Sequence, residues 1–189
     1  MRLLSWNCRG AGRAPTVRAL KALVRYEGPD VLFVAETKVK SPKMDMLKRG
    51  MGFSFCFCVD SVGKSGGLAL FWKMCIELEV VYSDNNLIAA LVYSDPPENA
   101  WLLLVVYGPP YVANRNHFWS LLENMVNSFS GQWLIIGDLN SMATRSEKKG
   151  GSSRGIISSR SFQNFVSNTG ALDLGFIGPK FTWSNQRVG

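Results

Sequence analysis

The sequence predicts an α/β protein in which two mostly antiparallel β-sheets pack face to face and helices lie outside them. Short apolar or alternating segments, separated by turns with Gly, Asp, Asn and Pro, fill the middle of the chain, and this pattern is typical of antiparallel strands. Amphipathic segments with helical spacing precede and follow this region. A chain of 189 residues can bury one sizeable core. We therefore predict a single domain that spans residues 1–189.

The N-terminal third of the chain alternates between strand and helix. Pro15 suits the first turn of a helix, and apolar side chains recur on one face of that helix from Val17 to Val24. The pair Gly28-Pro29 ends it. Strand, helix and strand in this order suggest a layered α/β arrangement. The predicted elements are a strand at 2–7, a helix from Pro15, a short buried strand at 30–36 and a helix around 43–49.

Strands dominate the middle of the chain, and helices return after it. Strand-like runs occur at 53–59, 67–72, 76–81, 87–93 and 101–107. A helix is predicted at 115–129, because its apolar residues from Phe118 to Val126 fall on one face. A strand at 133–138, a loop rich in Arg, Lys, Gly and Ser at 145–160, a helix at 159–168 and a strand at 180–183 complete the prediction.

The composition is that of a globular, basic protein. Hydrophobic residues make up 47% and charged residues 19% of the chain, which argues against disorder. The formal net charge of +7 favours an anionic partner, with nucleic acid ahead of a membrane. Many basic proteins bind nothing anionic, so the charge supports this hypothesis only together with other features.

Cysteine usage and the N-terminal sequence indicate a reduced, intracellular protein. The four cysteines, at positions 8, 56, 58 and 75, contain no C-x-x-C pair, and the chain has a single histidine, which disfavours a zinc site. We expect free thiols and no disulfide-linked partner. The sequence shows neither a signal peptide nor an apolar run long enough to span a membrane. A soluble nuclear or cytoplasmic protein is expected.

The most informative segment is a continuous apolar run, 133–136, that ends in Gly137-Asp138-Leu139-Asn140. Such a run predicts a buried strand. If the chain stays extended, Asp138 and Asn140 point to the same side, so that one could hold a water molecule and the other an anion. A simple turn that closes the strand explains G-D-x-N equally well when the segment is taken alone.

Polar residues also end three other predicted strands: Asn7, Glu36 and Tyr107. Each has an ordinary explanation, namely a turn residue, an exposed strand-end charge and a surface aromatic. The joint pattern is far less expected by chance than any one member. Glu36 and Asp138 directly follow apolar runs, where a carboxylate is costly to bury unless it is paired or binds a cation. Two such carboxylates suit a hard cation, and Mg²⁺ is the favoured ion, with Mn²⁺ as an alternative.

Several motifs together resemble the endonuclease/exonuclease/phosphatase superfamily, which has a DNase I-like fold. They are spread from residue 6 to residue 185 and occur in the order of that superfamily. Three of the sequences are similar to those of the apurinic-type endonuclease domain of plant LINE retrotransposons: W-N-C-R-G, E-K-K-G-G at 147–151 and F-T-W-S-N. The motifs are Trp6-Asn7-Cys8-Arg9-Gly10, Glu36-Thr37, Val106-Tyr107-Gly108-Pro109-Pro110, Gly137-Asp138-Leu139-Asn140 and Phe181-Thr182-Trp183-Ser184-Asn185.

The resemblance implies a four-layer sandwich with a Mg²⁺-dependent site at one edge of the sheets. Glu36 would bind the metal, and Asn7 would help hold it and orient Asp138. Asp138 would position or deprotonate the attacking water, while Asn140 would contact the scissile phosphate. Tyr107 would donate its hydroxyl to a phosphate oxygen or to the leaving group. A lesser, supporting role falls to Thr182.

Basic residues flank the proposed site and are candidates for contacts with DNA phosphates. Each of them, taken singly, is at least as well explained as a solvated loop charge. These candidates are Arg9, Arg13, Lys38, Lys40, Arg145, Lys148 and Lys149.

The chain departs from the superfamily near its end. Members carry an Asp in a strand soon after F-T-W, as L-D-R in the plant branch, and a final S-D-H motif. Neither occurs in these 189 residues, so we expect a C-terminally truncated domain that lacks its last strands. The only histidine, His117, lies on a predicted helix and is expected to be a surface or packing residue. We expect Asp173 to form a local turn or a cap.

Three functional hypotheses remain open from the sequence. The first is a Mg²⁺-dependent DNA endonuclease of LINE origin, weakened or inactive without the Asp-His pair, because acid–base help is typically worth ~10²–10⁴-fold. The second is a relic that binds nucleic acid or Mg²⁺ but has lost cleavage. The third is a phosphatase of the same superfamily that acts on phosphoinositides or another small phosphate ester.

Overall fold

The structure, a computed structural model of the chain, describes residues 1–63, 65–94, 96, 98–147, 159–178 and 181. Contacts divide the chain into two units. The first unit comprises Met1–Gly108 together with Phe129–Leu139 and contains both β-sheets. The second comprises Pro109–Ser128 together with Asn140–Gly189 and contains helices. Each unit is described by itself below.

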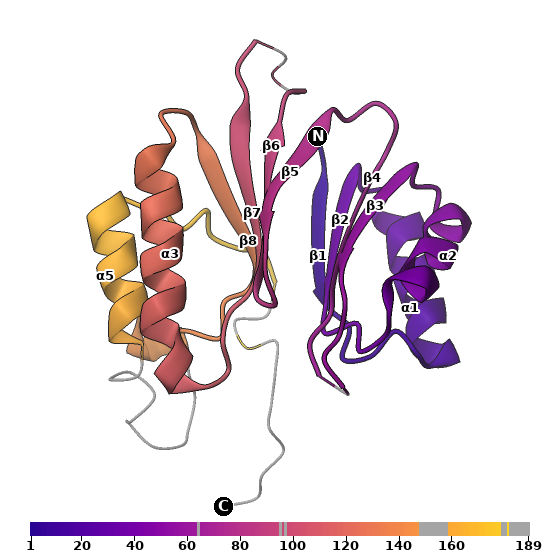
Figure 1. Cartoon of the computed structure of the whole chain (residues 1–189), viewed down its shortest axis with the longest axis horizontal. Helices are drawn as coiled ribbons and strands as arrows, with labels where there is room; N and C mark the ends of the chain where they lie inside the picture. The colour runs from indigo at the N-terminus through magenta and orange to yellow at the C-terminus, as the bar shows by residue number, and fades with distance from the viewer. Residues whose placement is uncertain (64, 95, 97, 148–158, 179–180, 182–189) are drawn as a thin grey trace, which may run out of the picture. The chain divides into compact units, whose positions relative to one another are not determined.

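The first unit is a pair of four-stranded sheets (Figure 1). The first sheet has the order β1-β2-β4-β3, and the second has the order β5-β6-β7-β8. The predicted α/β class is therefore confirmed. The strands of the first sheet are β1 (Leu3–Asn7), β2 (Val31–Ala35), β3 (Phe55–Val59) and β4 (Leu68–Trp72), and those of the second are β5 (Leu78–Ser83), β6 (Leu87–Val92), β7 (Trp101–Tyr107) and β8 (Trp133–Asp138).

Both sheets are mixed, with one parallel pair each. Short turns join β3 to β4, β5 to β6 and β6 to β7, and these pairs are antiparallel as predicted. Long helical connections separate β1 from β2 and β7 from β8, and these pairs are parallel, because only a crossover can return the chain to run in the same direction. The successive strands β4 and β5 lie in different sheets, so a short connection did not make them neighbours.

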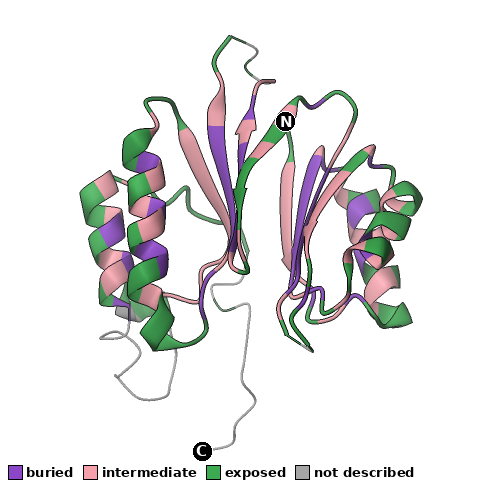
Figure 2. Ribbon diagram, in the orientation of Figure 1, coloured by how far each residue is buried: buried purple, intermediate pink, exposed green. Residues whose placement is uncertain are grey.

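The core between the sheets comes from alternate residues of the inner strands. In β2, Val31, Phe33 and Ala35 face the second sheet and pack in one cluster with residues such as Ile88 and Leu103. All five residues of β2 are buried, because its opposite face is covered as well. Figure 2 shows the same contrast between the buried inner strands and the partly exposed outer ones.

Two helices cover the outer face of the first sheet: α1 (Ala14–Glu27) and α2 (Ser41–Met51). Leu20, Val24 and Met44 project from them into a second core cluster that contains Leu32 and Val34 of β2. Both helices end at a glycine in the left-handed conformation, Gly28 and Gly52. The two helices predicted for this region are therefore confirmed.

The strand β8 corrects one prediction. Its bounds agree with the apolar run at 133–138, but every residue in it is only half-buried. A continuous apolar run predicted a strand covered on both sides, whereas β8 stands at the edge of its sheet in the order β5-β6-β7-β8. Leu134 and Ile136 still pack against the core between the sheets. An apolar run in the sequence indicates that a strand is hydrophobic, but it does not indicate whether other strands pair with it on one side or on both.

Within the second unit, α3 (Arg115–Ser128) and α5 (Arg160–Thr169) pack against each other. Trp119 is 1% exposed, and its ring contacts those of Phe162 and Phe165 at centroid distances of 4.6 and 5.2 Å. Two single turns of 3₁₀ helix, η1 (Val112–Asn114) and η2 (Arg145–Glu147), precede and follow α3 along the chain. The strand predicted at 180–183 falls almost entirely outside the described residues.

Two smaller predictions can also be compared with the structure. Asp173 accepts a hydrogen bond from the backbone N–H of Gly175, 2.8 Å from its Oδ1, which confirms the predicted local turn. No helix among the described residues is long and apolar enough to cross a membrane.

We predict that Trp119→Ala loosens the packing of α5 against α3. Removing the indole leaves a cavity among aromatic rings, and such large-to-small changes typically cost about 3–5 kcal/mol. Chemical denaturation measures this loss, and hydrogen exchange should show that α5 opens more readily. The matched variant Asn116→Ala, at an exposed position of the same helix, should be nearly neutral. Equal effects of the two variants would contradict the assignment of Trp119 as the anchor.

Candidate active site

Polar side chains from four strands meet at one end of the two sheets. Asn7 is the last residue of β1 and Glu36 follows β2, while Tyr107 and Asp138 end β7 and β8. Because each pair of strands is parallel, its two carboxyl ends lie side by side: Asn7 is in register with Ala35, and Tyr107 with Asp138. The edge strands β1 and β8 are also in contact with each other. The topology therefore gathers these four residues at one end of the sheets.

Asn7 joins the two sheets through its side-chain amide. Its Nδ2 donates one hydrogen bond to Oε1 of Glu36 and another to Oδ2 of Asp138, each at 2.9 Å. Both N–H groups of the amide thus donate to carboxylate oxygens. The remaining polar atom, Oδ1, is buried and has no hydrogen-bond partner. An unpaired buried oxygen is uncommon in native proteins, and Oδ1 of Asn7 is therefore an acceptor that a water molecule or an ion could use.

Glu36 belongs to a strained loop that is clamped by a pair of glycines. Glu36 and Lys38 both adopt the left-handed conformation, with φ of 52° and 55°, which costs a non-glycine residue about 1–2 kcal/mol. The backbone N–H groups of Thr37 and Lys38 donate to the carbonyls of Gly67 and Gly66, both at 3.0 Å. The hydroxyl of Thr37 lies where a side chain at Gly67 would project. These contacts hold the backbone of Glu36 in the left-handed conformation, which a non-glycine residue disfavours.

The environment of Glu36 favours its ionised form. Lys38 places its Nζ 3.0 Å from Oε2 of Glu36, and the carboxylate is only 16% exposed. Burial by itself raises the pKa of Glu36, but hydrogen bonds from Asn7, Lys38 and the Tyr107 side chain outweigh it, so the pKa lies below its ordinary value. Glu36 is therefore a charged, oriented oxygen donor at neutral pH.

Tyr107 and Asp138 are fixed by backbone contacts of their own strands. The carbonyl of Tyr107 accepts a hydrogen bond from Nδ2 of Asn86 at 2.7 Å, and its N–H donates to the carbonyl of Asn86 at 2.8 Å. Gly108 donates its N–H to the carbonyl of Asp138 at 2.7 Å. A side chain at Gly108 would overlap the backbone of Leu139, so only glycine fits there. The G-P-P motif thus begins with a residue that the strand-end geometry requires.

The structure adds residues that the sequence did not assign to the site. Gly66 and Gly67 hold the loop of Glu36, and Asn86 anchors the backbone of Tyr107. Lys38 was predicted to contact phosphates, and its observed partner is Glu36. Only the consecutive glycines gave a local signal, since two glycines in a row indicate an unusual backbone. The others depend on which strands pair.

The remaining candidates are distributed as follows. Arg9 and Arg13 are exposed and follow β1, and Arg9 has a left-handed φ of 52°. Asn140 belongs to the second unit, is half-buried and has a φ of 46°. The strand ends at Asp138, so the alternation that placed Asp138 and Asn140 on one side does not extend to Asn140. The side chain of Arg145, and the whole of Lys148, Lys149 and Thr182, lie outside the described residues.

The only histidine of the chain is exposed on α3 in the second unit. This position of His117 agrees with the predicted surface or packing residue.

The donor set at the strand ends fits a small, hard cation. The carboxylates of Glu36 and Asp138 and the unpaired Oδ1 of Asn7 are oxygen donors, which Mg²⁺ prefers. Among the described residues, no three side chains of His, Cys, Asp and Glu lie close enough together to form a metal site of their own. A cation here would therefore have few protein ligands and keep several waters, as Mg²⁺ commonly does.

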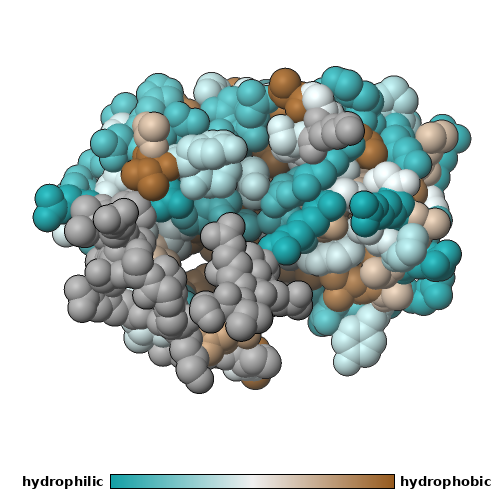
Figure 3. Space-filling view, turned by 90° about the horizontal axis from the view of Figure 1, so that it is seen from below, coloured by the Kyte–Doolittle hydropathy of each residue, from teal (hydrophilic) through white to brown (hydrophobic). Residues whose placement is uncertain are grey.

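Figure 3 views the molecule from the end at which β1 terminates. Hydrophilic and hydrophobic residues are interspersed on the part of this face that is drawn in colour.

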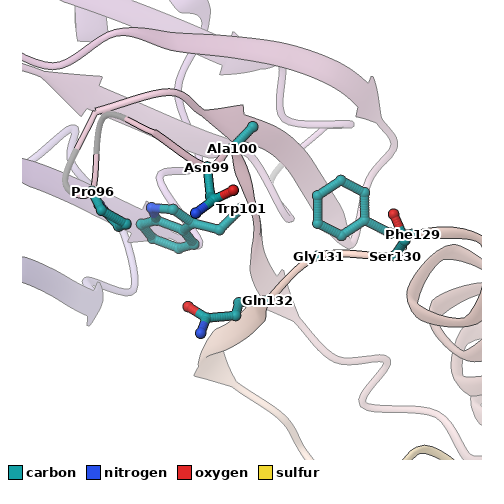
Figure 4. Close-up of a pocket in the computed structure, with 8 residues that line it drawn as sticks. All are labelled: Pro96, Asn99, Ala100, Trp101, Phe129, Ser130, Gly131 and Gln132. Atoms are coloured by element: carbon teal, nitrogen blue, oxygen red, sulfur yellow. The ribbon is translucent and has the colours of Figure 1, made fainter.

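A separate pocket lies at the opposite end of β7 (Figure 4). Its volume is about 580 Å³, and it adjoins Trp101, the first residue of β7, about 20 Å along the strand from Tyr107. None of its described lining residues is charged, so it offers no group for phosphate chemistry. The lining residues are Pro96, Asn99, Ala100, Trp101, Phe129, Ser130, Gly131 and Gln132.

We predict that Gly67→Ala disturbs the loop of Glu36 more than Gly66→Ala does. Both glycines have a positive φ, so both variants pay for backbone strain, but only at Gly67 would the new methyl group meet Thr37, Lys38 and Ser61. Gly67→Ala should therefore destabilise the fold by roughly 1–3 kcal/mol more than the control. Urea denaturation of the two variants provides the measurement. A difference near zero would show that the clamp is not tight.

We predict that Asn7→Ala raises the pKa of Glu36, since burial then opposes ionisation with one donor fewer. A depressed carboxyl pKa stabilises the folded state above the unfolded pKa of about 4.3, and this contribution fades as the pH falls through the folded value. The stability difference between the wild type and Asn7→Ala should therefore be largest near neutral pH and shrink in acid. Denaturation at several pH values tests this, with the exposed Asn85→Ala as the control. A difference that is constant across pH would refute the electrostatic role of Asn7.

Comparisons with known proteins bear on the family and the fold of the chain. A family model described as the Endonuclease/Exonuclease/phosphatase family matches residues 4–188. No curated protein sequence matched the chain.

Solved structures share the fold at low sequence identity. The chain resembles AP endonuclease LMAP from Leishmania major, with a TM-score of 0.65 and 16% identity over 89% of this chain and 66% of that one. It also resembles the 3'-5' exonuclease NExo from Neisseria meningitidis, with a TM-score of 0.65 and 17% identity over 89% and 71% of the two chains. A third is an AP endonuclease from Archaeoglobus fulgidus, with a TM-score of 0.67 and 11% identity over 88% and 70%.

The chain thus spans about two-thirds of the length of these structures, and just under two-thirds of the Leishmania enzyme. At this level of identity the structural matches show a shared DNase I-like fold and no more than the fold. The family model, in contrast, covers nearly the whole sequence and includes each strand that contributes to the site. The chain belongs to the endonuclease/exonuclease/phosphatase family.

Proposed function

We propose that this chain hydrolyses phosphodiester bonds in DNA with the help of Mg²⁺, for which Mn²⁺ is an alternative. One observation carries the proposal: the Asn7 amide joins the carboxylates of Glu36 and Asp138 from two different sheets and leaves its own oxygen buried and unpaired. A purely structural cluster would not need to bring two carboxylates together at this cost.

Glu36 and Asn7 would hold the cation. Glu36 is kept ionised, and Asn7 Oδ1 is the oxygen that lacks a partner. When bound, Mg²⁺ supplies positive charge that stabilises the negative charge developing on the phosphate. Lys38 already offsets the charge of Glu36, and this ammonium group would remain near the phosphate oxygens as a second positive charge.

The other residues would act on water and phosphate. Asp138, oriented by Asn7, would position a water molecule and accept its proton. Tyr107, held by Asn86, would donate its hydroxyl to a phosphate oxygen or to the leaving group. Asn140 would contact the scissile phosphate, and Thr182 would support the site. These assignments follow the family's pattern, residue by residue.

DNA is the proposed partner because positive charge is concentrated on the part of the chain that builds the site. Residues 1–60 contain eleven Lys and Arg against five Asp and Glu, whereas the rest of the chain is nearly balanced. The exposed Arg9 and Arg13 and the half-exposed Lys38 follow the strands that end at the site. Arg145, Lys148 and Lys149 would extend this contact. The related Neisseria 3' phosphatase NExo has been solved with a product DNA hairpin.

We further propose an origin in a plant LINE-type retrotransposon. The support is the amino-acid sequence of the motifs W-N-C-R-G, E-K-K-G-G and F-T-W-S-N. These motifs also favour a nuclease over a phosphatase for small phosphate esters.

The decisive experiment is nicking of supercoiled plasmid with Mg²⁺. Asp138→Asn keeps the shape of the side chain and removes its charge, so nicking should fall by about 10²–10⁴-fold, the usual worth of a general base. The exposed Glu77→Gln serves as a matched control and should leave nicking unchanged. A chelator should abolish nicking, and added Mg²⁺ should restore it. Nicking that survives in Asp138→Asn would show that this carboxylate is not the base.

A second candidate function is binding of DNA without cleavage. It is favoured by the charge of residues 1–60, which contain eleven Lys and Arg against five Asp and Glu, because such charge supports binding to DNA phosphates and does not require cleavage. Salt-dependent plasmid binding without nicking by the wild type would select this alternative. Release of phosphate from soluble esters, with plasmid left intact, would instead select the phosphatase.

A further inference from the structure

Two cysteines lie side by side on the edge strand of the first sheet. Cys56 and Cys58 are two residues apart in β3, so they share one face of the strand. Their Sγ atoms are 3.2 Å apart. Side chains at such positions normally stand parallel, roughly one strand repeat of about 6.6 Å apart. The two thiols therefore lean toward each other and form a dithiol pair.

The pair is set apart from the other two thiols of the chain. Cys8 is buried after β1, where its Sγ donates to the backbone carbonyl of Glu36 at 3.6 Å. Cys75 is exposed in the connection between the sheets. Cys56 and Cys58 are half-buried side chains of β3, and they pack against the core cluster that contains Met44 of α2. β3 pairs on one side only, with β4, so its backbone can shift at lower cost than an inner strand.

The two thiols differ in acidity. The hydrogen bond between them is the main reason why the pKa of Cys58 is lowered and that of Cys56 is raised. Cys58, whose pKa is the lower of the two, is thus the thiol that ionises first, and either sulfur can donate in the hydrogen bond between them. Lys48 favours the thiolates, while Asp45 and, at Cys58, Asp60 oppose them. A thiolate held beside a thiol is the arrangement used in thiol–disulfide exchange.

We propose that Cys56 and Cys58 form a reversible redox site, which low-molecular-weight disulfides or peroxides oxidise to an intrastrand disulfide and which captures thiophilic groups such as trivalent arsenicals.

Oxidation by glutathione disulfide proceeds in two exchange steps. The Cys58 thiolate attacks one sulfur of glutathione disulfide, forms a mixed disulfide and releases one glutathione thiolate. Cys56 then loses its proton to solvent, and its thiolate attacks Sγ of Cys58. The new Cys56–Cys58 bond forms as the second glutathione leaves. In total two protein thiols are oxidised, and one glutathione disulfide is reduced to two glutathione molecules.

The geometry makes this disulfide a labile one. Disulfides usually join Cα atoms ~4.4–6.8 Å apart, and residues i and i+2 of a strand are about 6.6 Å apart, near the upper limit. The strand must therefore bend for the bond to form, and a bond under such strain is easily reduced. A labile bond of this kind suits a regulatory site, not a structural crosslink.

Peptide mapping of the intact, reduced protein tests the proposal. Cleavage after Arg49 and Lys64 releases the peptide 50–64, which contains Cys56 and Cys58 and no other cysteine. After treatment with glutathione disulfide, we expect this peptide to lose the mass of two hydrogen atoms and to carry no glutathione. In Cys56→Ser the reaction should stop at a stable mixed disulfide on Cys58. The control Cys75→Ser should oxidise at the pair like the wild type.

A second measurement does not require the strand to bend fully. Phenylarsine oxide bridges two thiols with loss of water, and it should protect both cysteines of the peptide 50–64 from alkylation. This protection should vanish in Cys56→Ser and in Cys58→Ser and persist in Cys75→Ser. The proposal is overturned if the wild-type peptide stays reduced, carries one or two glutathiones, or crosslinks to Cys8, Cys75 or a second chain. It is also overturned if the arsenical does not protect the pair.

Discussion

One amide between two carboxylates holds the site of this protein together. Glu36 and Asp138 come from opposite sheets, and each would repel the other if they met unaided in a partly buried place. Asn7 donates a hydrogen bond to each carboxylate, and these bonds offset the repulsion between the two negative charges. It can do so because β1 stands at the edge of one sheet and touches β8 at the edge of the other. The arrangement of the edge strands and the chemistry of the site are therefore one feature.

The loop of Glu36 shows how the fold maintains an unfavourable conformation. Two residues with left-handed backbone, Glu36 and Lys38, flank the buried Thr37, whose backbone is clamped by Gly67. Strain of this kind persists only where surrounding contacts over-determine it, and it occurs preferentially at functional sites. The result here is a carboxylate directly after the end of β2 that accepts a hydrogen bond from Asn7. The two glycines take no part in the proposed chemistry, yet their contacts with Thr37 and Lys38 hold the loop that carries the carboxylate.

Charge and thiol chemistry add two further properties to the same unit. The excess of Lys and Arg in residues 1–60 gives this part of the chain a positive field, which would draw in a phosphate backbone and make its binding sensitive to salt. The dithiol of Cys56 and Cys58 lies in β3, at the other edge of the first sheet from Asn7 in β1. The connection between β3 and β4 includes Gly66 and Gly67, the two glycines that hold the Glu36 loop.

The sequence by itself indicated most of the helices and strands and supplied the candidate site residues. The apolar run before Asp138 predicted the bounds of β8. Asn7, Glu36 and Tyr107 were singled out because each is a polar residue directly after an apolar run, where burial of a polar group is costly unless the group is paired. Only the tertiary structure decided that β8 is a half-exposed edge strand, that β4 and β5 part into different sheets, and that Lys38 pairs with Glu36. Local patterns report propensity and apolarity along the chain. Strand order and the meeting of distant side chains depend on long-range pairing, which no local pattern encodes.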